Sequence, residues 1–381
     1  MTICFVASWY SATGPRIFHR HARLAAEEGY HVFVVARHQQ NEIVEGIQII
    51  AQPETGSRLC RILSTCKIAL AAWGTKADIY VFYDLELQPW GVLFKSFGKR
   101  VVVDIFEDNP SAMLIKSWIP KRLRRIFAAI VGAWEWTTAH LWDGIITADP
   151  GVMHRFEWKP AHRRAVVYNF PRLSVFSCEP SIETPYDVVY VGGLSVPRGT
   201  LLLARTVLEL RNCGQPCRVL LIGNYINPET ESAMTNFLLE HGLTDQFTFT
   251  GPLPYNEAMK YLSLAKVGVV PFEKGIQKYN NNIPSKMFDY WAAGLPVVVT
   301  DFNSAGSFVE QGINGLIVPA GSVNKLADVL RYLLTHAPEA RKMGSVGRQQ
   351  VLDRWNTDGP DNKELMKLFK SIMSSKSGRK N

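Results

Sequence analysis

The chain has 381 residues, 47% of them hydrophobic and 20% charged, a composition typical of folded domains that excludes a largely disordered chain. Its length predicts two domains, and no apolar run reaches the roughly 18 residues that a membrane-spanning helix needs. The formal net charge of +8 indicates an acidic partner, and nucleic acid, an anionic membrane surface and phosphorylated substrates all fit it. Because zinc-finger, helix-turn-helix and RNP-type motifs are absent from the sequence, we expect no nucleic-acid binding.

The N-terminus begins directly with a strand-like segment, without the charged and then apolar pattern of a signal peptide. We therefore expect a cytoplasmic protein. The six cysteines form no CxxC pair and the nine histidines are scattered, so no metal site is predicted.

The first half of the sequence alternates strand-like and helix-like segments. We expect a helix at 16–28 and strands at 3–7, 31–36, 46–51, 78–83, 100–105, 143–148 and 165–169. Such alternation predicts an α/β fold, with a parallel sheet covered by helices in a Rossmann-like architecture. Ligands bind beyond the carboxyl ends of the strands in such sheets, so residues 11–16, 83–88 and 104–110 are the informative positions.

The turn after the first strand contains Gly14 and Arg16. A single glycine is no dinucleotide fingerprint. The turn is either a backbone nest near a phosphate, with Arg16 in the first turn of the helix, or an ordinary strand-to-helix connection.

Residues 111–142 mix basic and large apolar side chains, among them several tryptophans. This composition is typical of a helix that lies on an anionic membrane surface. An amphipathic helix with its apolar face in the core remains the alternative. Arg58, Arg61 and Lys67 surround further apolar residues and extend the same pattern.

A change of composition marks the boundary between the domains. Residues 172–185 are rich in proline and poor in periodicity, which predicts a linker. Strands then follow at 187–191, 218–222, 246–250, 267–270, 296–300 and 315–318, with helices at 199–212, 323–334, 337–353 and 361–373. The predicted domains are 1–171 and 186–355. We expect residues 356–381 to form a helix that packs back on the first domain, followed by a basic tail.

Residues 282–296 join a loop, a short helix and a buried strand. Ser285 is the expected N-cap of this helix and Gly294 its stop. A loop that leads into a helix N-terminus suits a phosphate, and Lys286 and Asp289 lie in the helix's first turn. A diphosphate beside Lys286 and a ribose beside Asp289 would form a nucleotide-sugar site, and a solvated Lys and Asp is the alternative.

The ordered motifs of the chain resemble the retaining GT-B glycosyltransferases of family four. In the second half the resemblance rests on 189–193 (VYVGG), 198–199 (RG), 221–223 (LIG), 249–253 (FTGPL), 283–296 and 314–319 (NGLIVP). In the first half it rests on 15–16 (PR), 22–24 (ARL), 29–32 (GYHV), 83–87 (YDLEL) and 104–110 (DIFEDNP). The resemblance covers nearly the whole chain and implies two Rossmann-like domains facing each other across a cleft.

The resemblance also implies a donor site. In the family a basic residue after the glycine turn neutralises the diphosphate; Arg198 takes that place, while Gly193 stands where a second basic residue is usual and Lys286 is expected to replace it. Asp289 corresponds to the acid that binds ribose, and Asn281 to the acid beside the donor sugar. The expected donor-binding residues are Gly14, Arg16, Gly193, Arg198, Gly223, Pro252, Leu253, Asn281, Pro284, Lys286 and Asp289. Because cations and helix termini stabilise the leaving group, neither metal nor cofactor is expected.

Three positions depart from the family pattern: Asn281 replaces a glutamate, and Phe106 and Tyr83 stand where relatives often carry histidine. These departures leave the donor sugar open. In retaining enzymes of this fold the leaving diphosphate itself assists the acceptor hydroxyl. The resemblance implies that domain 1–171 binds the acceptor and domain 186–355 the nucleotide sugar. Carboxylates at strand ends of the acceptor domain are the expected catalytic side chains, namely Asp84, Glu107 and Asp108.

The resemblance therefore predicts a hexosyltransferase that moves a sugar from a UDP or GDP sugar to a lipid-linked saccharide. The expected pathway is capsule, O-antigen or exopolysaccharide synthesis, on the inner face of the plasma membrane. Two alternatives remain open: a non-catalytic GT-B protein that binds nucleotide sugar, and a GT-B nucleotide-sugar epimerase.

Overall fold

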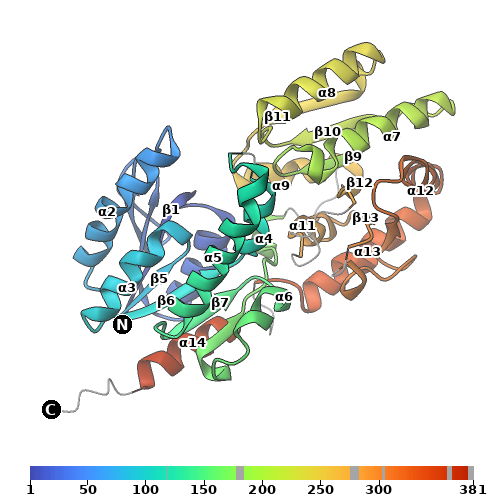
Figure 1. Ribbon diagram of the computed structural model, residues 1–381. Helices are drawn as coiled ribbons and strands as arrows, with labels where there is room; N and C mark the ends of the chain where they lie inside the picture. Colours follow the sequence, from blue (N-terminus) through green and yellow to red (C-terminus); the bar gives the residue numbers. More distant parts are fainter. Residues whose placement is uncertain (117, 177–183, 275–282, 303–304, 358–362, 376–381) are drawn as a thin grey trace. The chain divides into compact units, whose positions relative to one another are not determined.

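The computed structural model describes residues 1–116, 118–176, 184–274, 283–302, 305–357 and 363–375 (Figure 1). The chain divides into two compact units, one formed by Met1–Asn169 with Thr357–Asn381 and the other by Phe170–Asn356. Each is an α/β unit around its own sheet. Within the described part, no helix combines the length and the apolarity needed to cross a bilayer.

The first unit contains an eight-stranded sheet in the order β3-β4-β2-β1-β5-β6-β7-β8. Its strands are β1 (Thr2–Ser11), β2 (His31–Arg37), β3 (Glu42–Val44), β4 (Ile47–Gln52), β5 (Ile79–Phe82), β6 (Arg100–Ile105), β7 (Gly144–Thr147) and β8 (Arg164–Val166). All neighbouring pairs are parallel except β3 and β4. The central strands are buried on both faces, as the near-continuous apolar run of β1 from Ile3 to Ala7 illustrates.

Helices cover both faces of this sheet (Figure 1). They are α1 (Arg23–Glu27), α2 (Arg58–Gly74), α3 (Gln88–Ser96), α4 (Asn109–Ile115), α5 (Arg124–Ala139), α6 (Pro150–Met153) and α14 (Lys363–Ser374). Short 3₁₀ turns lie at η2 (Leu85–Leu87), η3 (Lys121–Leu123), η4 (His154–Phe156) and η5 (Ala161–Arg163). The predicted helix at 16–28 begins as a π-helix, η1 (Pro15–Ala22), a form often found at functional sites.

The C-terminal helix α14 lies beside β7 of the first unit (Figure 1). Gly144 permits this close approach, since a methyl group there would come within 2.9 Å of Ile372 Cδ1 and 3.1 Å of Leu368 Cδ1. An exposed ion pair between Lys370 Nζ and Glu28 Oε2 (2.9 Å) adds a contact at the edge. Residues more than 200 positions apart thus share one core.

The second unit contains a parallel six-stranded sheet in the order β11-β10-β9-β12-β13-β14. Its strands are β9 (Tyr186–Val191), β10 (Val219–Ile222), β11 (Phe247–Gly251), β12 (Ala265–Val270), β13 (Val297–Thr300) and β14 (Gly315–Val318). This is the doubly wound order of a dinucleotide-binding fold, which reverses between β9 and β12 and favours ligand binding at that point.

The helices of the second unit are α7 (Thr200–Asn212), α8 (Pro228–Glu240), α9 (Tyr255–Leu262), α11 (Lys286–Ala292), α12 (Val323–Thr335) and α13 (Ala337–Asp353). Its 3₁₀ turns are η6 (Leu173–Val175), η7 (Val196–Arg198), η8 (Thr244–Gln246) and η9 (Ala305–Ser307). The short helix α11 is anchored by its aromatic residues. Tyr290 Oη accepts a hydrogen bond from Val191 N (3.0 Å), and Trp291 Nε1 donates one to Asn314 O (2.8 Å).

Candidate functional site

Three glycine-bearing strand ends meet at the carboxyl edge of the second sheet. Gly192 N donates to Ile222 O (2.8 Å), and Gly223 N donates to Gly251 O (2.9 Å). The ends of β9, β10 and β11 are therefore adjacent, and they bring together Gly193, Gly223 and Pro252, three of the predicted donor-binding residues.

Two backbone positions at this edge of the sheet require glycine. Gly223 has a φ of +138°, and a methyl group there would lie 2.3 Å from Gly192 O. Gly199, just before α7, has a φ of +81°, and a methyl group there would lie 1.6 Å from Pro271 O. Gly199 follows β9 and Pro271 follows β12, the two strands between which the sheet order reverses. Glycine at position 199 therefore lets the two loops pack closely at the point where ligands bind in such sheets.

The amine of Lys286 lies at this same edge of the sheet, near Gly192. Its ammonium nitrogen is buried although the side chain as a whole is only partly so, and no described residue accepts a hydrogen bond from it. The nitrogen lies 3.7 Å from the centroid of the Tyr190 ring and 5.9 Å from that of Phe272. Burial, and next the charge of Arg198, hold the pKa of Lys286 well below its usual value, while Asp289 opposes the shift. Burial therefore disfavours the charged form of this amine, and an anion bound beside it would favour that form.

Arg198 is the second cation of the edge and ends η7. A methyl group on Gly193 would lie 3.1 Å from Arg198 Nη1 and 3.0 Å from Ile226 Cδ1, so Gly193 leaves room for the guanidinium. A basic side chain at position 193 would have to displace it. The unit therefore presents Arg198 and Lys286, as predicted, and their mutual repulsion favours binding of a group with more than one negative charge.

Asp289 is buried and faces a residue that the sequence did not single out. Tyr255 Oη donates a hydrogen bond to Asp289 Oδ1 (2.8 Å). Tyr255 is the first residue of α9 and comes two residues after Leu253, so this bond joins the stretch that contains Pro252 and Leu253 to the expected ribose-binding acid. The only sequence feature that could have singled out Tyr255 is its position, as an aromatic residue at a helix start beside the predicted donor-binding residues.

The helix that carries Lys286 begins differently from the prediction. Ser285 occupies the predicted N-cap position, but its backbone angles are helical and its side chain accepts no capping hydrogen bond. Pro284 is buried, and its carbonyl accepts a hydrogen bond from Met287 N (3.2 Å), which tightens the first turn instead. Gly294, with a φ of +79°, ends the helix as predicted. Asn281 lies outside the described residues.

In the first unit, Asp84 lies at the end of β5 beside the end of β1. Its Oδ2 accepts hydrogen bonds from Ser8 N (2.6 Å), Ser8 Oγ (3.1 Å) and Trp9 N (3.1 Å). Burial, and next the charge of Glu86, raise the pKa of Asp84 to about 6. The sheet order of this unit reverses between β1 and β5, so Asp84 also occupies a switch point where ligands bind.

Arg16 and Gly14, predicted on the donor side, belong to the first unit. The guanidinium of Arg16 forms two hydrogen bonds to Asp104 (2.6 and 2.8 Å) and donates to Val167 O and Asn169 Oδ1 (2.9 and 2.8 Å). These bonds tie the helix start to β6 and the end of β8. Gly14 N donates to Ser11 O (2.9 Å), and this turn leads directly into η1.

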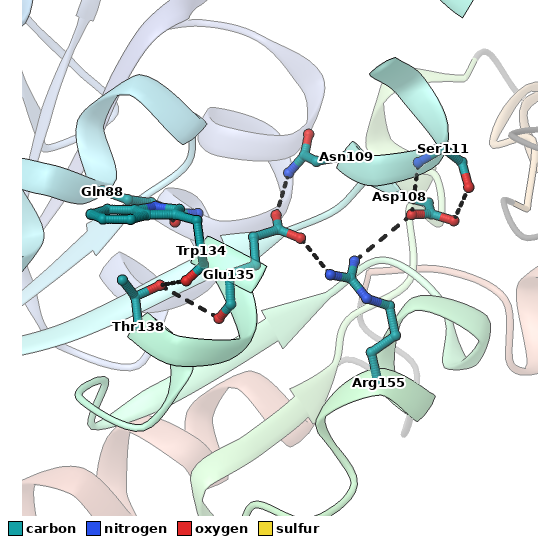
Figure 2. Close-up of polar contacts among 8 residues, drawn as sticks. All are labelled: Gln88, Asp108, Asn109, Ser111, Trp134, Glu135, Thr138 and Arg155. Atoms are coloured by element: carbon teal, nitrogen blue, oxygen red, sulfur yellow. Dashed lines mark hydrogen bonds and ion pairs between the residues drawn. The ribbon is translucent and has the colours of Figure 1, made fainter. Parts of the chain in front are cut away.

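Asp108 and Glu107 follow β6. Asp108 caps α4, accepting hydrogen bonds from Ser111 N (3.3 Å) and Ser111 Oγ (2.6 Å), as Figure 2 shows. Glu107 is partly buried, and after burial its charge is the next largest cause that raises the pKa of Tyr10. Glu107 is therefore near the end of β1, while Asp108 has a structural partner.

A buried ion pair lies behind this loop (Figure 2). The carboxylate of Glu135 in α5 accepts hydrogen bonds from Asn109 Nδ2 (2.7 Å) and Arg155 Nη2 (2.8 Å), and Arg155 Nη1 lies 3.7 Å from Asp108 Oδ1. The network ties the loop after β6 to α5 and η4.

Parts of the chain are similar to known glycosyltransferases. Residues 185–336 match the family described as Glycosyl transferases group 1. Over 118 residues the chain is 30% identical to the GDP-mannose-dependent alpha-(1-6)-phosphatidylinositol monomannoside mannosyltransferase of Mycobacterium tuberculosis, covering 31% of each chain. It is 22% identical over 153 residues to the amylovoran biosynthesis glycosyltransferase AmsK of Erwinia amylovora, covering 40% of this chain and 37% of that one.

The likeness extends over the whole chain in structure. HepE of Anabaena, solved in complex with UDP-glucose, superposes with a TM-score of 0.73 at 13% identity, covering 97% of this chain and 100% of the other. The chain spans about a third of the length of the curated relatives that it matches first. The predicted α/β class with two Rossmann-like domains is confirmed.

Proposed function

Residues 185–336 belong to the group 1 glycosyl transferases and the chain has the GT-B fold, and from this premise we propose that the protein is a retaining glycosyltransferase. It moves a hexose from a nucleoside diphosphate sugar to a lipid-linked saccharide during the synthesis of a surface polysaccharide. AmsK, a relative named for amylovoran biosynthesis, supports the polysaccharide pathway.

The buried ammonium of Lys286 beside Arg198 is the observation that carries the proposal. Transfer of the sugar leaves a diphosphate with additional negative charge. Two preorganised cations at a sheet's switch point stabilise that charge more strongly than the ground state, which accelerates the departure. The diphosphate then accepts the proton of the acceptor hydroxyl on the same face of the sugar, so the bond forms with retention and needs neither an enzyme nucleophile nor a metal.

The donor is a UDP or GDP sugar. GDP-mannose appears in the name of one relative, and UDP-glucose is bound in the solved HepE structure. Asp289, held by Tyr255, binds the ribose hydroxyls, and Pro252 and Leu253 contact the base. Asp84 and Glu107 orient the acceptor, and the role expected for Asn281 toward the sugar falls outside the described residues.

The acceptor reaches the protein at an anionic membrane surface on the cytoplasmic side. The outward face of α5 and the segment before it exposes large apolar residues: Trp118, Leu123, Ile126, Phe127, Ile130, Trp134 and Trp136. Lys121, Arg122 and Arg125 are exposed at the same end, whereas Glu135, the one acid of α5, is buried. Apolar and aromatic residues with a basic rim match the interface of an anionic bilayer.

Nucleotide binding tests the donor site. Isothermal titration of UDP, GDP, UDP-glucose and GDP-mannose should show one preferred nucleotide, and Arg198→Ala should weaken its binding at least about tenfold by removing a charge-assisted contact. Equal weak binding to both proteins would contradict the site assignment.

A non-catalytic nucleotide-sugar binder is the second candidate, because Asn281 and Phe106 replace polar groups expected near the sugar. Such a protein would bind donor without hydrolysing it in the absence of acceptor. An epimerase, which needs no acceptor, would instead convert the bound sugar in that same assay.

A further inference from the structure

Trp9 stands at the switch point of the first sheet in an unusual environment. The ladder between β1 and β5 ends at the pair Val6 and Phe82, so Ser8, Trp9 and Tyr10 extend beyond it. Trp9 is 49% exposed, at the edge where ligands bind in open α/β sheets. Its backbone is fixed, since Asp84 Oδ2 accepts hydrogen bonds from both Ser8 N and Trp9 N.

Two guanidinium groups lie close to the indole ring. The Cζ atoms of Arg37, at the end of β2, and Arg61, in α2, lie 5.3 and 4.8 Å from the ring centroid. Each arginine also has an acid partner: Arg37 Nη2 lies 2.7 Å from Glu54 Oε1, and Arg61 Nε lies 2.6 Å from Glu86 Oε1. The cluster thus presents donors and acceptors around an aromatic face without a large excess of either charge.

From this arrangement we propose that Trp9, Arg37, Arg61 and Glu86 form a stacking subsite for a neutral sugar ring of the acceptor. An indole face buries the apolar C–H face of a pyranose, while guanidinium and carboxylate groups bond to its hydroxyls. Ser8 Oγ donates to Glu86 Oε1 (2.8 Å) and orients that carboxylate. In the part of the chain that the structure describes, neither Arg37 Nε nor Arg61 Nε, both buried, has a hydrogen-bond acceptor, although Arg61 Nε is ion-paired with Glu86.

The charge balance selects the neutral ring over an anion. A phosphate site concentrates cations without paired acids, whereas the cations here are paired and Asp84 adds a further carboxylate. The same acids disfavour contact between Trp9 and an anionic bilayer. The inference rests on the proposed function for its role in acceptor binding, but binding itself needs no donor.

Saturation-transfer NMR tests the subsite with methyl α-mannopyranoside and methyl α-glucopyranoside, beside glucuronate and inorganic phosphate. The full chain without nucleotide should transfer saturation to at least one neutral glycoside, Trp9→Ala should reduce the transfer to background, and Trp9→Phe should retain part of it. Trp158→Ala, which removes a tryptophan of the same unit that is 44% exposed, is the matched control and should bind as the wild type does.

Three outcomes would overturn the inference: no transfer to either neutral glycoside, transfer that Trp9→Ala leaves unchanged, or binding of glucuronate or phosphate alone. The proposed donor site fails separately, if no nucleoside diphosphate binds. Glycoside binding at Trp9 with no nucleotide binding would keep this subsite and reject the transferase.

Discussion

The ammonium nitrogen of Lys286 lies 3.7 Å from the centroid of the Tyr190 ring, and no described atom accepts a hydrogen bond from it. The ring's negative face compensates only part of the cost of burying the charge. A methyl group on Gly192 would lie 3.3 Å from the same nitrogen, so the glycine turn, the aromatic ring and the cation are packed against one another. Burial thus disfavours the charged form of Lys286, and the diphosphate of the proposed donor would favour it.

Replacing Lys286 by Met should therefore stabilise the free protein and impair ligand binding. Removal of the unpaired buried cation should raise the free energy of unfolding by about 1–2 kcal/mol. Affinity for UDP or GDP should fall at least about tenfold. Chemical denaturation and titration calorimetry measure the two effects.

Lys266→Met, at an exposed lysine paired with Asp187, is the control and should change neither the free energy of unfolding nor the nucleotide affinity by much. A destabilised Lys286→Met protein with unchanged affinity would contradict the interpretation.

Gly199→Ala tests the backbone approach beside Arg198. The new methyl group would overlap Pro271 O, in addition to the strain of a positive φ, so we expect a loss of about 3 kcal/mol or more in stability. Gly214 is a matched control, because its φ of +78° is nearly the same and no atom lies within 4 Å of the added methyl group. Gly214→Ala should cost only about 1 kcal/mol. Equal losses in urea denaturation would show that the contact with Pro271 does not matter.

Much of the fold could be predicted because buried parallel strands are nearly continuous apolar runs. Segments such as 3–7, 187–191 and 315–318 coincide with β1, β9 and β14 to within a few residues. Strand β3 was missed because it has only three residues and forms a hairpin through Glu45 and Gly46, both with positive φ. Its local sequence has neither the length nor the Asn-Gly or Asp-Gly signal of a hairpin.

The polar partners of the site residues could not be predicted, because they lie far away in the sequence. Lys286 and Asp289 could be singled out from their place at a helix start, but the bond from Tyr255 joins residues 34 positions apart. Arg16 and Asp104 are 88 positions apart, so no local pattern indicates that the guanidinium of Arg16 is bonded within the first unit. Such pairs depend on which strand ends become neighbours, which local propensity does not determine.

The pKa of Asp84 predicts a pH-dependent stability. Because burial and Glu86 raise it from 3.8 to about 6, the folded protein keeps the proton over a range in which the unfolded chain has lost it. This carboxyl therefore makes the protein less stable as pH rises from about 4 to about 6, by up to about 3 kcal/mol. Asp84→Asn should flatten that part of the stability profile in denaturation between pH 4 and 7. Asp78→Asn, at an exposed acid that accepts a hydrogen bond from Thr2 N, should leave the slope in place.

The apolar face of α5 predicts binding to anionic vesicles. Replacing both Ile126 and Ile130 by Glu removes two exposed apolar side chains and adds two negative charges, so partitioning should fall on the order of 100-fold. Flotation with vesicles containing phosphatidylglycerol measures it, and added salt should weaken wild-type binding. Leu239→Glu, at an exposed leucine of α8 in the other unit, should float as the wild type does. Unchanged flotation of the double variant, with dimerisation lost in size-exclusion chromatography, would identify the face as a contact between copies instead.

The ion pair between Glu135 and Arg155 should stabilise the first unit. Glu135 is fully buried, whereas the side chain of Arg155 is 28% exposed, so the pair lies at the margin of the core. Glu135→Leu alone would leave Arg155 and Asn109 without their acceptor, and Arg155→Met alone would leave a buried carboxylate without its cation. Each should cost about 2–4 kcal/mol.

Because the two penalties have the same origin, the double variant should be less destabilised than the sum of the single variants, by about 1–3 kcal/mol. Urea denaturation of the four proteins in this cycle gives the coupling energy. Lys367→Met with Glu364→Leu, an exposed pair on α14, provides a second cycle in which the coupling should stay below about 0.5 kcal/mol. Additive effects at Glu135 and Arg155 would mean that the ion pair shown in Figure 2 does not couple α5 to η4. A measured coupling would instead show that the pair holds η4 to α5, the helix proposed to contact the membrane.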